Sequence, residues 1–480
     1  MKAKLFFGIL ATCAVVLLSS CSGKSNNVCL ESCGPGAATL SLTISDTPPA
    51  KTSIVSFTLP VIGITLTSSA GQTPVSSTTQ NFELTRLQSD TNLIATTLGV
   101  TAGTYTAINV TVSAPSAVFA NSSSSTVGTC VAGAYCTLTG NPGTITYTFP
   151  ANSPLILTAN SKQWLNLDFN YNNAIVTTNG IGIDITQTGV LTASTTVPTG
   201  VSSGNVANID DFTGGVTAIS ASSITLVSSV RGTLIATIGS STQIFDPQSQ
   251  CTQAGGNLLP CIKLGSIVSL QGVLSNTGVA TATSLDVIDQ SATPADEVEG
   301  ILYPSNCNGG SNYGMILGDS EIFTSGSPLT SANFGAGICL TLNQATTFAI
   351  DTGVLTGQSG VPTTVGFAGT GDILAGQTVR AKVTSATGTS PVNATATELI
   401  LRFSRITGTV ASSGTTFTVN GLPAYLGNFN GAPQVATHTN ATIFEGVTDP
   451  NSLTVGSTVS INALYLKAAP TFQAAKVRVP

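Results

Sequence analysis

The residues that could support hydrolysis by a nucleophile are few and scattered. His438 is the only histidine of the 480-residue chain and lies in the polar run ATHTN. A serine or cysteine nucleophile needs a base held beside it, and the sequence has neither a Gly-x-Ser-x-Gly turn nor a Ser-x-x-Lys pair in a recognisable frame. A phosphate-binding Gly-x-x-x-x-Gly-Lys-Ser/Thr loop is also missing. We expect His438 to be a surface residue of a turn or strand.

Two groups of acidic residues have the composition of a glycosidase pair. They are Asp210 with Asp211, and Asp296 with Glu297 and Glu299. Two carboxyl groups that flank a glycosidic bond can hydrolyse it. Both groups fall at predicted repeat boundaries, where acidic residues are usually solvated. We therefore expect solvated hinge residues and no enzyme activity.

One stretch resembles part of a calcium loop. Asp168, Asn170 and Asn172 alternate in NLDFNYNN and copy the start of an EF-hand loop. Asn173 and Asn179 occupy the positions of its glycine and its bidentate glutamate. An extended strand spreads such side chains apart, so a polar strand face is the alternative. We keep the three residues as a calcium candidate and otherwise predict no metal and no cofactor.

The cysteines predict disulfides. Apart from Cys13 and Cys21, eight remain and fall into four local pairs. An even number in an exported protein favours disulfides, whereas a zinc site needs closely spaced cysteines converging with histidine. Neighbours in sequence need not be partners, but the predicted bridges are Cys29–Cys33, Cys130–Cys136, Cys251–Cys261 and Cys307–Cys339.

The N-terminus predicts export and lipidation. Lys2 and Lys4 precede an apolar stretch over residues 5–18, which is shorter than the roughly 20 residues of a spanning helix. Leu-Ser-Ser-Cys21 then resembles the lipobox of bacterial lipoproteins. The resemblance implies removal of residues 1–20, diacylglycerol on the Cys21 sulfur and an acylated amino terminus. We expect anchoring to the bacterial outer membrane or cell envelope, with residues 21–38 as a lipidated tether.

The composition favours an all-β protein with a neutral surface. Charged residues make up only 8% of the chain, against about 25% in ordinary domains. Loss of the signal peptide leaves 13 basic and 21 acidic residues, a net charge of −8. These charges are scattered singly, which argues against nucleic acid as a partner. We expect the basic residues near Lys467, Lys476 and Arg478 to form a solvated strand face.

The first domain is predicted to be an antiparallel β-sandwich over residues 39–187. Apolar residues alternate with polar ones in at least six short segments, including 40–44, 62–66 and 165–171. LSLTISDTPPA (40–50), FELTRLQSDTNLIATTLGVTAGTYTAINVTVS (82–113) and WLNLDFN (164–170) resemble an uncharacterised bacterial lipoprotein domain family. That resemblance implies an immunoglobulin- or transthyretin-like sandwich and carries no known activity.

After a Thr/Ser/Gly-rich linker (188–206), three degenerate repeats are predicted at 207–290, 296–403 and 404–480. A glycine followed by a strand marks each one: KLGSIVSLQG, LAGQTVRAKV and TVGSTVSINA. A Thr-containing strand precedes this mark (TQIF, TTFA, ATIF), and an Ala-containing strand follows it. Such periodicity predicts three small domains rather than one large one. The repeats resemble a second uncharacterised family of exported β-domains, which implies small OB- or SH3-like barrels.

These observations predict a non-catalytic, envelope-anchored lipoprotein that binds a surface ligand or serves as a structural spacer. A polysaccharide or another envelope protein is the expected partner, besides the membrane itself. Tyr313 with Asn306, Asn308 and Asn312 is the candidate sugar-binding group, since sugars stack on aromatic rings and bond to amides. The alternative is a subunit or tip component of a surface fibre, and a glycan-active enzyme is the third hypothesis.

Overall fold

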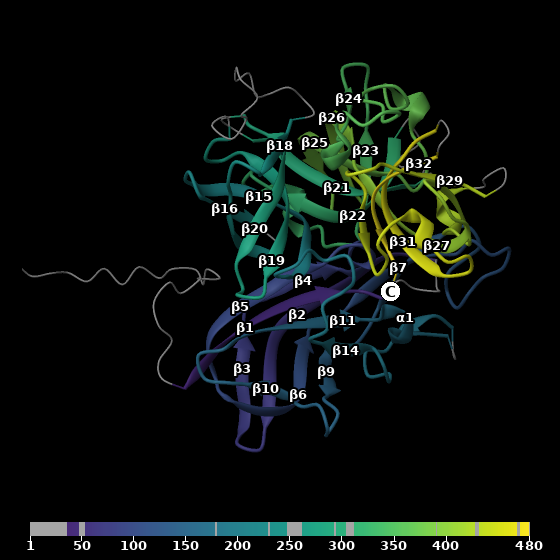
Figure 1. Ribbon diagram of the computed structural model, residues 1–480. Coiled ribbons are helices and arrows are strands. Elements are labelled where there is room, and N and C mark those ends of the chain that lie inside the picture. Colours follow the sequence, from purple (N-terminus) through teal and green to yellow (C-terminus); the bar gives the residue numbers. More distant parts are fainter. Residues whose placement is uncertain are drawn as a thin grey trace, which may run out of the picture.

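The computed structural model describes residues 36–47, 53–177, 180–228, 231–246, 262–291, 294–303, 312–389, 391–427, 432–467 and 471–479. They form a β-sandwich and three small barrels, which confirms the predicted all-β class (Figure 1). We call the units the sandwich (37–194), barrel 1 (205–289), barrel 2 (296–401) and barrel 3 (403–478).

The sandwich has two sheets around one core. One sheet has the order β14-β11-β1-β5, and the other β10-β6-β2-β7-β8, with β3 and β4 also on β2 and β9 on β6. β1 runs parallel to β11, so the sandwich is not antiparallel throughout as predicted. β14 lies beyond the predicted end of this domain and pairs with β11. The bounds are β1 (Ala37–Ser45), β2 (Ile54–Ser68), β3 (Gly71–Ser76), β4 (Gln80–Glu83), η1 (Leu84–Gln88), β5 (Asn92–Thr101), β6 (Gly103–Val112), β7 (Ser116–Ala120), β8 (Tyr135–Thr139), β9 (Gly143–Thr148), β10 (Leu155–Leu157), β11 (Lys162–Phe169), α1 (Tyr171–Ala174), β12 (Ile175–Val176), β13 (Gly182–Ile183) and β14 (Leu191–Ser194).

The three barrels share one topology. Each barrel has five strands, counted without a short extra strand that lies between the third and the fourth in the sequence. The first strand pairs with the second and the fourth, and the third pairs in parallel with the fifth, which closes the barrel. This is the Greek-key closure of an OB-fold. A short extra strand pairs in parallel with the last strand. The strands are β15 (Asn205–Ile219), β16 (Ser223–Ser228), β17 (Gly232–Thr237), β18 (Gln243–Phe245), β19 (Ile267–Ser275) and β20 (Ala280–Asp289) in barrel 1; β21 (Asp296–Tyr303), β22 (Asn312–Glu321), β23 (Gly337–Thr341), β24 (Thr347–Ile350), β25 (Thr378–Thr387) and β26 (Val392–Leu401) in barrel 2; and β27 (Phe403–Ser412), β28 (Thr416–Asn420), β29 (Gln434–Thr437), β30 (Ile443–Glu445), β31 (Thr458–Tyr465) and β32 (Phe472–Arg478) in barrel 3.

The repeated glycine has the same backbone role in every barrel. Gly265, Gly376 and Gly456 have φ values of +84°, +87° and +89°, a region that residues with a side chain rarely adopt. The N–H of each donates to a carbonyl of its barrel's first strand at 2.8 Å. The glycine therefore turns the chain into β19, β25 or β31 and fixes that strand beside the first.

The repeated threonine fastens the extra strand. The hydroxyls of Thr242, Thr346 and Thr442 donate to the carbonyls of Ala282, Ala396 and Ala474 at 3.0, 2.9 and 2.7 Å. Each hydroxyl also accepts an N–H from its own turn. The second sequence mark is thus a side-chain clamp between the extra strand and the last strand of each barrel.

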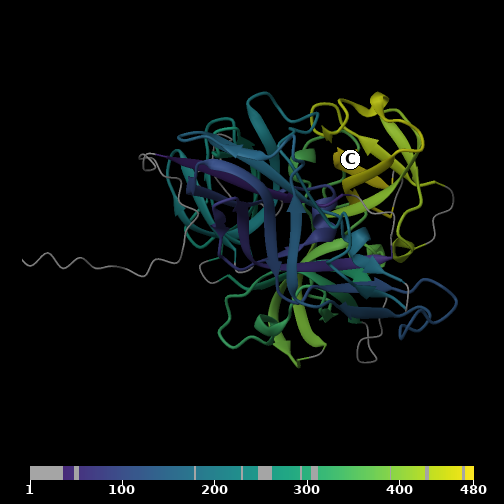
Figure 2. The ribbon, with the colours of Figure 1, turned by 90° about the horizontal axis from the view of Figure 1, so that it is seen from below.

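The barrels gather at one end of the sandwich instead of forming a string (Figures 1 and 2). Trp164, the only tryptophan, is buried in the core of barrel 1 together with Leu93, although both belong to the sandwich. Tyr135 of the sandwich and Tyr303 of barrel 2 have ring centroids 4.7 Å apart. Apolar contacts therefore join the sandwich to at least two barrels.

Candidate functional site

A buried network of ion pairs lies where the four units meet. Glu299 of β21 is fully buried and has four guanidinium groups within 4 Å of its carboxylate. They are Arg86 of the sandwich at 2.7 Å, Arg380 of barrel 2 at 3.2 Å, Arg402 after β26 at 3.4 Å and Arg405 of barrel 3 at 3.9 Å.

The carboxylate of Asp319 connects barrel 1 to this network of ion pairs. It lies 3.2 Å from Arg231 of barrel 1, 3.8 Å from Arg380 and 4.0 Å from Arg86. A buried charge is tolerated only when it is paired. Glu299 and Asp319 therefore need side chains from all four units, and each unit's cations need those two carboxylates.

A second group of ion pairs joins barrel 1 to barrel 3. Lys476 is 2% exposed, and its ammonium lies 2.7 Å from Asp210 and 3.0 Å from Glu445. Arg478 pairs with Glu445 at 3.4 Å and donates to the Leu87 carbonyl of the sandwich at 3.2 Å. The prediction of a solvated strand face for Lys476 was wrong, because the outer face of β32 is covered by barrel 1.

The prediction of solvated hinge residues is also wrong for four of the five acidic residues, whereas the side chain of Asp211 in β15 lies outside the described ones. Asp210, Asp296, Glu297 and Glu299 are all at most 5% exposed. Glu297 pairs with Arg380 at 3.2 Å, whereas Asp296 accepts the N–H groups of residues 323 and 324. Their roles in this structure are therefore those of internal ion pairs and turn caps.

Burial changes the acidity of two of these carboxyl groups. Burial raises the pKa of Glu297 to about 7, although Arg380 opposes the change. Burial likewise raises the pKa of Asp210 to about 6, against the attraction of Lys476. Glu445 has the opposite balance: Lys476 and Arg478 outweigh its burial and lower its pKa. The junction thus contains acids that accept protons near neutral pH.

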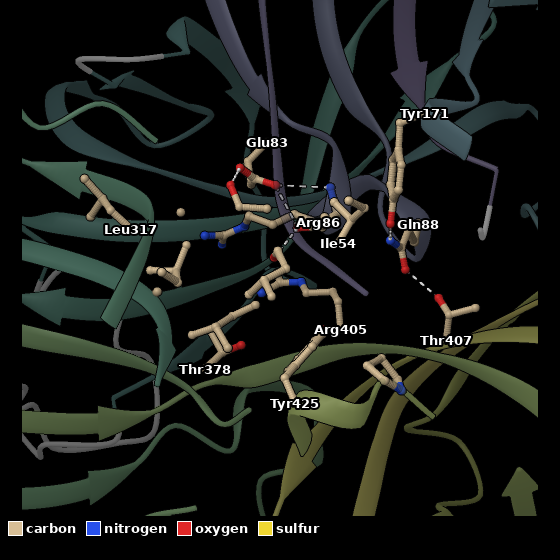
Figure 3. A pocket seen from close by; sticks show the side chains of 18 residues that line it. Ile54, Glu83, Arg86, Gln88, Tyr171, Leu317, Thr378, Arg405, Thr407 and Tyr425 are labelled. Atoms are coloured by element: carbon tan, nitrogen blue, oxygen red, sulfur yellow. Dashed lines mark hydrogen bonds between the residues drawn. The ribbon is translucent and has the colours of Figure 1, made fainter. Parts of the chain in front are cut away.

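A small cavity lies beside the network (Figure 3). Its volume is about 40 Å³, and its walls come from the sandwich, barrel 2 and barrel 3. Arg86 and Arg405 reach it from opposite sides, and a chain of hydrogen bonds runs from Tyr171 through Gln88 to Thr407. One water needs roughly 10–15 Å³ on this measure, so the cavity suits a few waters rather than a ligand.

A larger pocket is formed by all three barrels. Its volume is about 290 Å³, and barrel 1 supplies its floor through β18, β19 and β20. Residues 354–358 of barrel 2 and 440–443 of barrel 3 form the walls. We call it the inter-barrel pocket. No sequence pattern pointed to it, because its lining comes from three separate repeats.

The other predicted residues are dispersed. The Nε2 of His438 lies 2.8 Å from the Gln473 amide oxygen inside barrel 3, a structural contact. Tyr313 is half-buried against the core of barrel 2. Asn306 and Asn308 lie outside the described residues, and Asn312 belongs to β22.

The calcium candidates do not share one element. Asp168, the second-last residue of β11, accepts hydroxyl hydrogen bonds from Ser45 and Thr47. Asn170 precedes α1, and Asn172 lies within it. Across the described ranges, no three His, Cys, Asp or Glu side chains are grouped so as to hold a metal ion. In the same ranges, no helix has the length and apolarity needed to cross a membrane.

The Cys130–Cys136 disulfide is present, with Cα atoms 5.8 Å apart. Cys339 in β23 is also disulfide-bonded, while its predicted partner Cys307 lies outside the described residues. The other cysteines with a predicted lipid or disulfide also lie outside the described residues: Cys21, Cys29, Cys33, Cys251 and Cys261.

The comparisons with known proteins identify one domain. Residues 37–185 match the model of a domain of unknown function, DUF4382. None of the curated proteins matches the chain. Among solved structures, the Drosophila protein "Unr CSD456" is matched with 10% identity over 56% of this chain and 97% of that chain, with a TM-score of 0.13. So low a TM-score supports no conclusion.

Proposed function

We propose that this protein is a non-catalytic lipoprotein that holds a rigid binding head at the bacterial cell envelope. Cys21 would carry the lipid, residues 22–35 would act as the tether, and residues 36–479 would be the head. Several acyl chains anchor a protein durably, since each buried methylene contributes about 0.8 kcal/mol. The observation that carries the proposal is the inter-barrel pocket, a ligand-sized concavity that needs all three barrels.

The buried junction favours a binding head over a spacer. A spacer gains length when its domains form a string, whereas these barrels fold back onto the sandwich (Figure 2). Glu299 and Asp319 bring cations from all four units within 4.0 Å. Such a junction fixes the relative positions of the barrels, which a pocket between them requires and a spacer does not.

The fibre-subunit alternative finds less support. Strand addition needs a long, open sheet edge. At the sheet edges of the sandwich, β10, β14 and β8 have three, four and five residues, and short edge strands disfavour pairing with another chain. The remaining edge strand, β5, has ten residues, and its first four, residues 92–95, are buried.

Anchoring is tested by fractionating cells that express the natural chain or the Cys21→Ser variant. The natural protein should sediment with membranes and label with radioactive palmitate, and the variant should do neither. A variant that still sediments with membranes and resists carbonate extraction would contradict the lipid anchor.

Binding is tested with the full-length acylated protein in mild detergent. It is passed over immobilised neutral polysaccharides (dextran, galactomannan, xyloglucan), acidic polysaccharides (alginate, pectate) and an envelope-protein fraction. Saturable retention on any of these supports a binding head. A protein that none of them retains, with or without calcium, would leave only the spacer and fibre hypotheses.

A further inference from the structure

The three barrels present the same pair of residues at the same place, and each barrel uses it differently. The pair lies directly opposite on the fourth and fifth barrel strands: Gln271 and Ser284 in barrel 1, Lys382 and Glu398 in barrel 2, Asn462 and Lys476 in barrel 3. Because the register is identical, the three pairs lie on equivalent faces of the three barrels.

In barrels 2 and 3, this face forms a contact with another unit. Lys382 binds Asp289 of barrel 1 at 3.1 Å. Lys476 binds Asp210 of barrel 1, and Asn462 approaches Asp90 of the sandwich at 3.5 Å. The equivalent face of barrel 1 is the floor of the inter-barrel pocket. Barrel 1 therefore keeps open a surface that its two relatives use for docking.

The side chains around this floor have unused hydrogen-bonding capacity. The amides of Gln243, Gln271, Gln358 and Asn440 line the pocket and form no side-chain hydrogen bond within the part of the chain that the structure describes. An amide offers two donors and an acceptor, so it can bond a hydroxyl group in either direction. Four such amides from three barrels match a ligand with several hydroxyl groups.

The pocket also has an apolar side and little net charge. The half-buried ring of Phe245 and the side chain of Ile443 line it beside the amides. Asp210, the one charged residue in the described part of the lining, is neutralised by Lys476 at 2.7 Å. Among the described lining residues, phosphate or carboxylate ligands find no free cation, whereas the C–H face of a sugar ring packs well on an aromatic ring.

We propose that the inter-barrel pocket binds one neutral sugar unit of a polysaccharide, with hydroxyl groups on the four amides and a ring face on Phe245. The volume of about 290 Å³ lies near the lower end of the roughly 300–1,000 Å³ range of small-molecule pockets, which fits a terminal or single sugar unit. The pocket differs from the strand 2–3 face that OB-folds use for oligosaccharides. The inference rests on the proposed binding function and names its ligand and its place.

One variant blocks the pocket and leaves the Gln271–Ser284 pair of its floor intact, and a second removes one amide of that floor. Thr283 is an exposed residue at the rim, and Thr397 occupies the equivalent strand position in barrel 2, outside the pocket. Thr283→Trp and the control Thr397→Trp therefore add the same side chain to equivalent exposed strands. Gln271→Ala, with the exposed Gln434→Ala of barrel 3 as its control, removes one amide. Far-UV circular dichroism and thermal unfolding of the full chain verify folding.

We expect the natural protein to bind one of the neutral polysaccharides, Thr283→Trp to lose binding, and Gln271→Ala to bind about tenfold more weakly, as the loss of about 1.4 kcal/mol implies. Both controls should bind like the natural protein. Equal binding by Thr283→Trp and Thr397→Trp would overturn the inference and leave the proposed function intact. Retention by acidic polysaccharides or envelope proteins alone would do the same. Retention by nothing would overturn both.

Discussion

Replacing Glu299 by glutamine should weaken the junction while hardly changing its shape. The carboxylate has four guanidinium groups between 2.7 and 3.9 Å away. At an effective dielectric constant of about 20, each such pair attracts by roughly 4 kcal/mol or more. Most of this attraction offsets the desolvation of the buried carboxylate and guanidinium groups. Removing one partner of a buried ion pair costs about 3–5 kcal/mol in measured cases, and we expect a loss of that size.

The assay follows urea unfolding by two signals. Fluorescence of Trp164 reports on the contact between the sandwich and barrel 1, and far-UV circular dichroism reports on all strands. In Glu299→Gln, we expect a lower urea midpoint and a separation of the two unfolding curves, because no single carboxylate then links the sandwich to both barrel 2 and barrel 3.

The matched control is Glu398→Gln, which removes a carboxylate 3.8 Å from a partly exposed Lys382 and should cost less than about 1 kcal/mol. If Glu299→Gln unfolds at the same urea concentration as Glu398→Gln, the junction is not what couples the units.

Three further changes test the local arguments. Between about pH 4.5 and 7 the folded chain keeps a proton on Glu297 that the unfolded chain releases. The free energy of unfolding should therefore fall as the pH rises through this window, by up to about 1.4 kcal/mol per pH unit. Glu297→Gln should flatten that slope in unfolding experiments at several pH values. Gly456→Ala should lower the free energy of unfolding by about 1–2 kcal/mol in chemical denaturation, because its φ is +89°. Gly376→Ala should lower it further, because the new Cβ would lie 2.2 Å from a Leu426 methyl group. Equal losses of stability in the two variants would contradict this account. Thr442→Val removes one hydrogen bond and leaves the His438 N–H without its acceptor, which should cost about 1–3 kcal/mol and speed amide exchange in β30, whereas unchanged exchange would argue against the clamp.

The sequence predicted the units because their marks are local. Gly265 and Gly456 need a positive φ, and Thr242 needs a carbonyl on the neighbouring strand; both requirements are met within one barrel. Period-two alternation similarly predicted strands such as 40–44, whose apolar residues are buried in the sandwich. The parallel pairing of β1 with β11 was missed, since alternation is the same in parallel and antiparallel strands.

The junction was missed because its members lie far apart in the chain. Arg86 and Glu299 belong to different domains, and local patterns give no information on how domains dock. One signal was present: Val379, Ala381 and Val383 mark the inner face of β25, so Arg380 and Lys382 had to point outward. Outward-facing charges predict a solvated face. In this chain, however, the outer face of a barrel often packs against another unit at the junction.

The few charges of the chain help to position the inter-barrel pocket. A buried ion pair adds little net stability, but it penalises every arrangement in which one partner is left alone. Lys476 and Asp210 therefore hold barrel 3 against barrel 1 in one orientation, and Asp210 is itself part of the pocket lining. Moving barrel 3 away would break this pair and withdraw Asn440 and Ile443 from the pocket wall. The charges that the chain keeps inside thus fix the geometry of a site whose own lining is almost entirely neutral.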